Sequence, residues 1–327
     1  MICANNNAIN FSSIPIPPEM QLWSGEALRN HHYPKDHIQT IEIAVAYCDA
    51  DLQWLMNSIA HELPKQSTVK ITFLSKCEND MQIPEFTSIP NVKKVEILTL
   101  PNKGGCDLAF AHFINQYMAR ENARTAATTV IFFLKDTPRL SKNCHQRGRY
   151  RSFHEMLHIS SSYGEFVCGV KLKCDWSAFH DTRILKSFAK NSYKRHGDSS
   201  QSNKDFNSAD YKDIENFIDR EFEWSFPNNE VTEVCYGGTF AVPAARLFAD
   251  EKLRGVFSRL ESILLKGPSM SVVEHFAERL WASWLANPLD RNETETIYTL
   301  RRSIRTEQGR YMGTLITDDD TARQCGL

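Results

Sequence analysis

The chain has 327 residues and a formal net charge of −2, with a sequence pI of about 6.6. A charge this small gives no overall field that would recruit nucleic acid or a membrane surface. Hydrophobic residues make up 42% and charged residues 24%, which is the balance of a soluble globular protein. No run approaches the ~18 apolar residues of a membrane-spanning helix, and the first residues lack the pattern of a secretory signal.

The nine cysteines are an odd number and form no CxxC pair. This usage predicts free thiols in a reducing compartment rather than a disulfide framework or a structural zinc site. Together with the absence of a visible signal sequence, it favours a cytoplasmic location. No feature of the sequence indicates an oligomeric state.

The N-terminal half alternates strand patterns with helical ones after an irregular lead-in of residues 1–40. Apolar runs of strand length lie at 41–47, 69–75, 92–100 and 128–134, and helical patterns lie at 52–60 and 108–119. Continuous apolar strands that alternate with helices are typical of a parallel sheet covered on both faces. We therefore expect an α/β fold with one mostly parallel twisted sheet flanked by helices and a Rossmann-like N-terminal half.

The second half is less regular but continues the same domain, which we expect to span residues 41–286. Its predicted elements are a basic loop at 139–151, a helix at 153–160, a strand at 165–173, a helix at 213–223, a glycine turn with a short strand at 235–246, and a helix at 272–285. Residues 191–210 are polar and predict a mobile insertion. Residues 287–327 form a polar C-terminal extension.

Two polar features follow predicted strands, where open α/β sheets bind ligands. Asp49 and Asp51 follow the first strand, and either could contact a ligand or only cap the next helix. The turn after the third strand consists of Asn102, Lys103, Gly104 and Gly105. It precedes a helix, whose N-terminus favours anions, and Lys103 adds a positive charge. A plain turn is the alternative.

A third polar feature is Asp136, at the end of the fourth strand, with the basic loop behind it. A carboxylate there could hold a divalent cation such as Mn²⁺ or Mg²⁺ while arginines of the loop, among them Arg147, neutralise phosphates. An aspartate in water at a strand end is the alternative.

The helix at 272–285 carries a polar row beside its apolar stripe. Glu274, Glu278 and Trp281 follow one another at steps of four and three residues, so they share one helix face. Like charges four residues apart weaken a helix slightly, which favours a role for the pair. Glutamates that simply face water are the alternative.

The segment from His154 to His158 matches HExxH, with Glu155 as its acid. This spacing places two imidazoles on one helix face around zinc, with the glutamate as general base. No metzincin extension follows and no third ligand stands out, so we place a zinc hydrolase second.

Five segments in this order resemble an uncharacterised domain family of microbial eukaryotes whose members are similar to A-type-fold glycosyltransferases. They are AVAYCDADLQWL (44–55), LPNKGGCD (100–107), VIFFLKD (130–136), CYGGTFAV (235–242) and ERLW (278–281). The resemblance covers most of residues 41–286. It implies an enzyme that binds a nucleotide-sugar donor and transfers the sugar to an acceptor hydroxyl.

The resemblance also implies roles for particular residues. On the donor side it implies Asp49, Asp51, Arg147 and the turn 102–105, with Asp136 as the metal-binding acid. On the acceptor side it implies Tyr236, Gly237, Gly238 and Trp281. Glu278, or Glu274, would be the general base that activates the acceptor hydroxyl. The chain departs from the usual Asp-x-Asp metal motif, because residues 135–137 contain one acid only. A third hypothesis is therefore a non-catalytic nucleotide-sugar-binding protein on the same scaffold.

Overall fold

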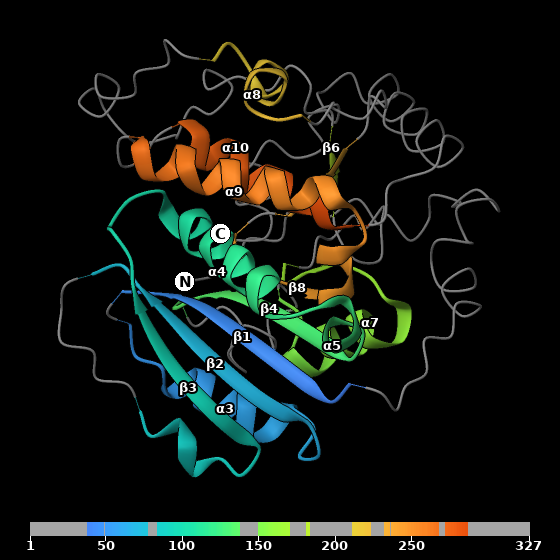
Figure 1. Cartoon of the computed structure of the whole chain (residues 1–327). Helices are drawn as coiled ribbons and strands as arrows, with labels where there is room; N and C mark the ends of the chain where they lie inside the picture. Colours follow the sequence, from blue (N-terminus) through green and yellow to red (C-terminus); the bar gives the residue numbers. More distant parts are fainter. Residues whose placement is uncertain are drawn as a thin grey trace, which may run out of the picture.

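The computed structural model describes residues 38–48, 50–77, 84–137, 150–170, 181–183, 211–223, 232–235, 237–267 and 272–286. Residues 1–37 of the predicted lead-in, the insertion at 191–210 and the C-terminal extension lie outside these ranges, and Thr40 already belongs to the first strand. A six-stranded sheet organises the described residues, with the strand order β3-β2-β1-β4-β8-β5 (Figure 1). A separate two-stranded sheet pairs β6 (Asp181–Arg183) with β7 (Thr232–Val234).

The four predicted N-terminal strands are confirmed and form the parallel part of the sheet. They are β1 (Thr40–Tyr47), β2 (Thr68–Ser75), β3 (Val92–Thr99) and β4 (Thr129–Lys135). The last two strands differ in direction: β8 (Phe240–Pro243) is antiparallel to β4, and β5 (Val167–Cys168) is antiparallel to β8. The expected mostly parallel α/β sheet is therefore confirmed. Within the strand predicted at 165–173, the described residues 165–170 contain β5 and an isolated bridge from Val170 to Tyr150, and residues 171–173 lie outside the described ranges.

Helices cover both faces of the sheet because successive strand side chains point to opposite faces. Ile131 and Phe133 of β4 join one core with α4 (Gly105–Arg120), α8 (Ile214–Glu221), α9 (Glu251–Lys266) and α10 (Val272–Leu285). Val130 and Phe132 join the other core with α3 (Gln53–Glu62) and α7 (Phe153–Tyr163). Figure 1 shows α4, α9 and α10 on one side of the sheet and α3 on the other.

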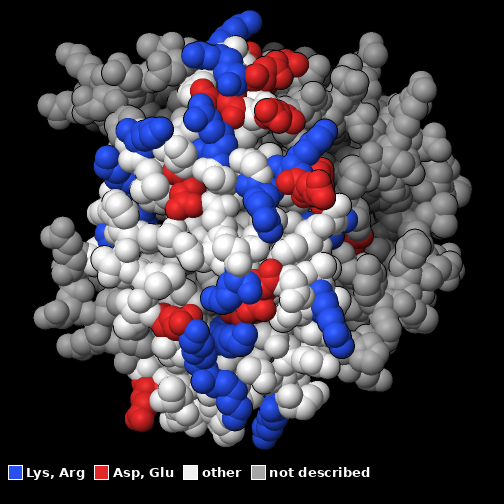
Figure 2. Space-filling model, viewed as in Figure 1, with Lys and Arg blue, Asp and Glu red and all other residues white. Residues whose placement is uncertain are grey.

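Three short helices complete the described part: η3 (Phe86–Ser88), α5 (Ala123–Ala126) and η7 (Ala244–Phe248). None of the described helices is long and apolar enough to cross a membrane. On the face drawn in Figure 2, acidic and basic side chains are interspersed rather than sorted by sign.

Two disulfides contradict the prediction of free thiols. Cys48 pairs with Cys77, and Cys168 pairs with Cys235. The first pair joins the residues that follow the adjacent parallel strands β1 and β2, so the sheet itself brings these two cysteines together. Among the described residues, Cys106 is a free thiol. The prediction was wrong because cysteines without a spacing motif can still meet through the tertiary fold.

Candidate active site

The sheet has a topological switch point between β1 and β4. From β1 the chain passes to β2 and β3 on one side, and then returns to place β4 on the other side. Ligands of open α/β proteins bind at the carboxyl ends of strands at such a point. The ends of β1 and β4 are tied together there, because the Asp136 backbone N–H donates to the Ala46 carbonyl at 3.2 Å.

Asp136 is half-buried at this point and braces the strand ends. Its Oδ2 accepts a hydrogen bond from the Cys48 backbone N–H at 2.8 Å, and its carbonyl accepts one from Trp54 Nε1 at 3.4 Å. Within the described ranges, no three or more His, Cys, Asp or Glu residues gather closely enough to hold a metal. We derive no chemical step through a metal.

The structure describes only some of the predicted donor-side residues. Asp49 and Arg147 lie outside the described residues, as does Tyr236 of the predicted acceptor side. Asp51 is exposed and its Oδ1 accepts a hydrogen bond from the Gln53 backbone N–H at 2.9 Å. The expected N-cap is one residue off, because Leu52 occupies the cap position of α3 and makes no side-chain bond there.

The glycine turn before α4 is shaped by helix packing. Gly104 and Gly105 both have positive φ, at 63° and 51°, a conformation that glycine adopts without strain. A Cβ on Gly104 would lie 2.9 Å from Leu264 Cβ, so a side chain there would push α9 away from α4. Asn102 and Lys103 of the same turn are exposed. A lysine that the sequence did not single out reaches the turn instead: Lys76 Nζ donates to the Gly105 carbonyl at 2.5 Å.

The two glutamates of α10 lie above the carboxyl edge of the sheet. Glu278 Oε1 accepts a hydrogen bond from the Gly237 backbone N–H at 3.0 Å and lies 4.0 Å from Lys135 Nζ. Its Oε2 lies 3.7 Å from Arg279 Nη1. Glu274 covers the start of α4, with Oε2 3.3 Å from where a Cβ on Gly105 would stand. Glu278 is thus bonded to the glycine turn that precedes β8.

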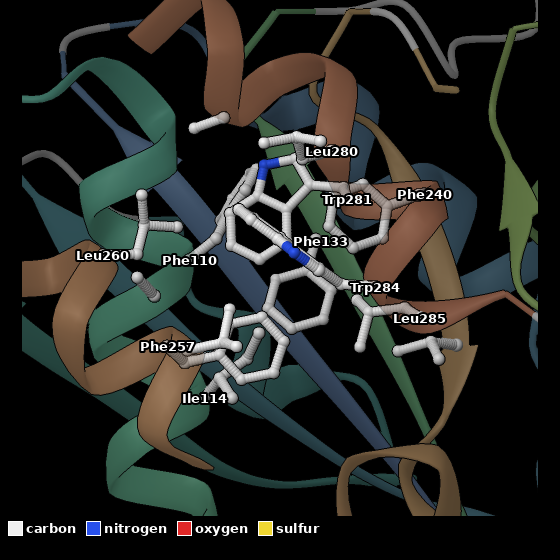
Figure 3. Close-up of a cluster of buried hydrophobic side chains, with 14 of the residues drawn as sticks. Phe110, Ile114, Phe133, Phe240, Phe257, Leu260, Leu280, Trp281, Trp284 and Leu285 are labelled. Atoms are coloured by element: carbon white, nitrogen blue, oxygen red, sulfur yellow. The ribbon is translucent and has the colours of Figure 1, made fainter. Parts of the chain in front are cut away.

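Trp281 differs from its predicted position at the rim of the acceptor side. Its side chain is completely buried, and its ring stacks on Phe257 with centroids 5.8 Å apart (Figure 3). Its Nε1 donates to Asp107 Oδ1 at 2.6 Å. The helical spacing correctly placed Trp281 one turn after Glu278 on α10. At Trp281, however, this face of the helix packs into the core, whereas at Glu278 it is partly exposed.

Asp107 is the functional candidate that sequence reasoning missed. It lies in the first turn of α4 and is 4% exposed. The pKa of its carboxyl is raised to about 7, chiefly by burial and also by Glu278 and Glu274, against the lowering effect of Trp281 and Lys135. An acid in the first turn of a helix usually only complements the helix dipole, so the sequence held no sharper signal.

The neighbours of Asp107 have perturbed pKa values for the same reason. Burial lowers the pKa of Lys76, an effect that Glu274, Cys106 and Asp107 oppose. Burial raises the pKa of Cys106 far above its usual range, and Asp107 raises it further. Because the nucleophilic form of cysteine is the thiolate, this thiol is not poised for nucleophilic attack.

Gly238 lets Lys135 and Cys106 approach the second glycine turn. Its φ is +60°, and a Cβ there would collide with Lys135 Cε and lie 2.9 Å from Cys106 Sγ. Gly238→Ala should therefore lower the free energy of unfolding by about 2 kcal/mol or more, since left-handed backbone alone costs roughly 1–2 kcal/mol with a Cβ. Urea unfolding monitored by circular dichroism measures this change.

Gly255 in the middle of α9 is the matched control. A Cβ there would meet nothing within 4 Å. Gly255→Ala should raise the free energy of unfolding by about 0.5–1 kcal/mol, because alanine is the better helix former. Equal responses of the two variants would contradict the close approach at Gly238.

The HExxH segment lies on the other face of the sheet from this cluster. His154 and His158 are exposed on α7, and His158 Nδ1 lies 3.1 Å from Ser162 Oγ. The α7 helix packs in the core with α3, whereas α4 and α10 share the opposite core. The predicted helix is confirmed, but no third ligand accompanies the two histidines among the described residues.

Comparisons of the chain with protein-family models, curated proteins and solved structures found no match. The site itself combines three acids: Glu278, next to a backbone N–H and a lysine; Glu274, over a helix start; and the buried Asp107. Carboxylates in such a setting suit proton transfer. Lysines next to a helix N-terminus suit an anionic ligand.

Proposed function

We propose that this protein is a glycosyltransferase-like enzyme that moves a sugar from a nucleotide-sugar donor to an acceptor hydroxyl. The observation that carries the proposal is the placement of Glu278. Its Oε1 is bonded to the Gly237 backbone N–H and lies 4.0 Å from Lys135, which ends the switch-point strand β4. Its side chain keeps 23% of its surface exposed, so an acceptor can reach it.

Glu278 takes the role of general base in this proposal. It removes the proton from the acceptor hydroxyl as the oxygen attacks the anomeric carbon and the bond from that carbon to the nucleotide breaks. The nucleotide leaves as an anion. Described cations near this carboxylate are Lys135 Nζ, Arg279 Nη1 and Lys76 Nζ, the last bonded to the start of α4. Positive groups aimed at developing negative charge stabilise a transition state.

The experiment that tests the proposal incubates the full chain with a panel of UDP-, GDP- and CMP-sugars, with Mn²⁺ or with EDTA. Chromatography of the released nucleotide measures hydrolysis or transfer, and a thermal-shift assay measures binding. We expect at least one donor to raise the melting temperature and to release nucleotide over time. A saturating donor at about 100 times its Kd stabilises by roughly 2.7 kcal/mol. If no nucleotide sugar binds or turns over under either condition, the proposal is wrong.

Binding without turnover would instead favour the non-catalytic binding protein. Comparing turnover in Mn²⁺ with turnover in EDTA also tests the prediction that Asp136 helps to hold a divalent cation. Nucleotide release that needs Mn²⁺ would therefore direct attention to the segments next to Asp136.

A further inference from the structure

The buried carboxyl of Asp107 connects two helices that are far apart in sequence. Its Oδ1 accepts the Trp281 indole N–H at 2.6 Å across 174 residues. Asp107 belongs to the first turn of α4, and Trp281 belongs to α10 one turn beyond Glu278. This bond therefore ties the helix that carries the proposed base to the helix that begins at the glycine turn.

Charged and titratable groups face Asp107 from every element packed around it. They are Cys106 of α4, Lys76 after β2, Lys135 of β4, and Glu274 and Glu278 of α10. The two glutamates repel an ionised Asp107, while Lys135 and the indole N–H favour it. A neutral Asp107 is free of this repulsion and keeps an oxygen that can accept the indole hydrogen bond.

Trp281 transmits the state of Asp107 into the core and along α10. Its ring contacts Phe110, Phe240 and Phe257, so it has little room to move independently of its helix (Figure 3). Close-packed interiors pass on small displacements rather than absorb them. A shift at the Asp107–Trp281 bond therefore acts on Glu278, one turn away.

We propose that Asp107 is a proton-binding positioning residue, which holds α10 through Trp281 and makes the placement of Glu278 depend on whether Asp107 is neutral or ionised. Asp107 is not a catalytic residue, because it is buried beneath the site. The Asp107–Trp281 bond and the burial of both side chains are features of the described residues and do not depend on the proposed function. Only the consequence for catalysis rests on the proposed function.

The sign of the pH dependence follows from the raised pKa. Between the ordinary pKa of an aspartate and about 7, the folded chain holds a proton on Asp107 that the unfolded chain releases. The contribution of this proton to stability is therefore present at low pH and is lost as the pH rises toward about 7. Asp107→Asn keeps an oxygen for the indole bond and removes the titration.

The decisive experiment measures the melting temperatures of the wild-type chain and of Asp107→Asn from pH 4.5 to pH 8.5. We expect the difference, variant minus wild type, to increase with pH by roughly 2–4 °C or more and to level off above about pH 7. A purely structural hydrogen bond would give a constant difference. A difference that does not change with pH overturns the proposal.

A second measurement uses the wild-type chain, so that the test survives if Asp107→Asn does not fold. The indole N–H signal of Trp281, identified by its loss in Trp281→Phe or by sequential assignment, should shift with pH with a midpoint near 7. Trp54 is the matched control, because its indole N–H donates to a backbone carbonyl, that of Asp136, and not to a side-chain carboxyl. A Trp281 signal as insensitive to pH as that of Trp54 overturns the proposal.

The activity arm separates this inference from the proposed function. If the chain transfers sugar, kcat of the wild type should change with a midpoint near pH 7 that is missing in Asp107→Asn. If melting and indole titrations behave as expected but no nucleotide sugar is used, the positioning device stands and the proposed function fails. If the chain turns over a nucleotide sugar but Asp107 does not titrate, the proposed function stands and the positioning role of Asp107 fails.

Discussion

Replacing Glu278 with glutamine is expected to lower kcat for sugar transfer by about 10²–10⁴-fold, the usual contribution of a general base. Glutamine has nearly the same shape and its Oε1 can still accept the Gly237 N–H, so the turn before β8 keeps its anchor. What the variant loses is the ability to take a proton from the acceptor. The melting temperature and donor affinity should therefore change little, and steady-state kinetics at saturating donor should locate the loss in kcat.

Glu274→Gln is the matched control, since it removes the same charge from the same helix one turn earlier. Glu274 lies over the start of α4, whereas Glu278 accepts the Gly237 backbone N–H. We expect its kcat to stay within about tenfold of the wild type, because a nearby charge contributes less than the proton acceptor itself. If Glu274→Gln loses turnover while Glu278→Gln retains it, the base is Glu274. Full activity in both variants would remove general-base catalysis by α10.

The core of the fold could be predicted from sequence because its central strands β1 and β4 are almost entirely buried. In β1 and β4 almost every side chain is apolar, as burial on two faces requires, and this pattern is independent of tertiary detail. The α9 helix was missed, although its buried residues Leu253, Val256 and Leu260 are spaced helically. Polar residues and Gly255 lie between these apolar residues in the sequence. Only the packing of α9 on α4 shows that the apolar residues form the buried face of a helix.

The candidate site could be predicted only in part, because its decisive contacts join residues distant in sequence. The spacing along α10 identified Glu278, and the glycines identified the turn that bonds it, but no local pattern links residues 41 positions apart. Asp107 was missed for the same reason. Its surroundings come from β2, β4 and α10, so neither its burial nor its raised pKa can be inferred from residues 100–107. The pairing of Cys48 with Cys77 likewise follows from the strand order.

Replacing Trp281 with alanine is expected to lower the free energy of unfolding by about 3–5 kcal/mol, the usual cost of removing a large aromatic side chain from a core. The ring is completely buried among Phe110, Phe240 and Phe257, so the cavity would open in the middle of the layer between α10 and the sheet. Loss of the indole N–H would add to this cost, because Asp107 would remain buried with its Oδ1 unpaired. Denaturant unfolding at pH 7 measures the change.

The contribution of the hydrogen bond can be separated from that of the ring by comparing two phenylalanine variants. Trp284 belongs to the same cluster and is almost as deeply buried, but its Nε1 has no hydrogen-bond partner among the described residues. Both variants remove some ring volume. Trp284→Phe removes a buried donor that has no partner among the described residues, whereas Trp281→Phe removes a donor that is bonded to Asp107. We expect Trp281→Phe to cost about 1–3 kcal/mol more than Trp284→Phe, the usual penalty for leaving a buried polar group unpaired.

This excess cost of Trp281→Phe should be smaller at low pH, where Asp107 is neutral and less costly to leave unpaired. Equal costs at every pH would mean that the Asp107–Trp281 bond does not hold α10 in place.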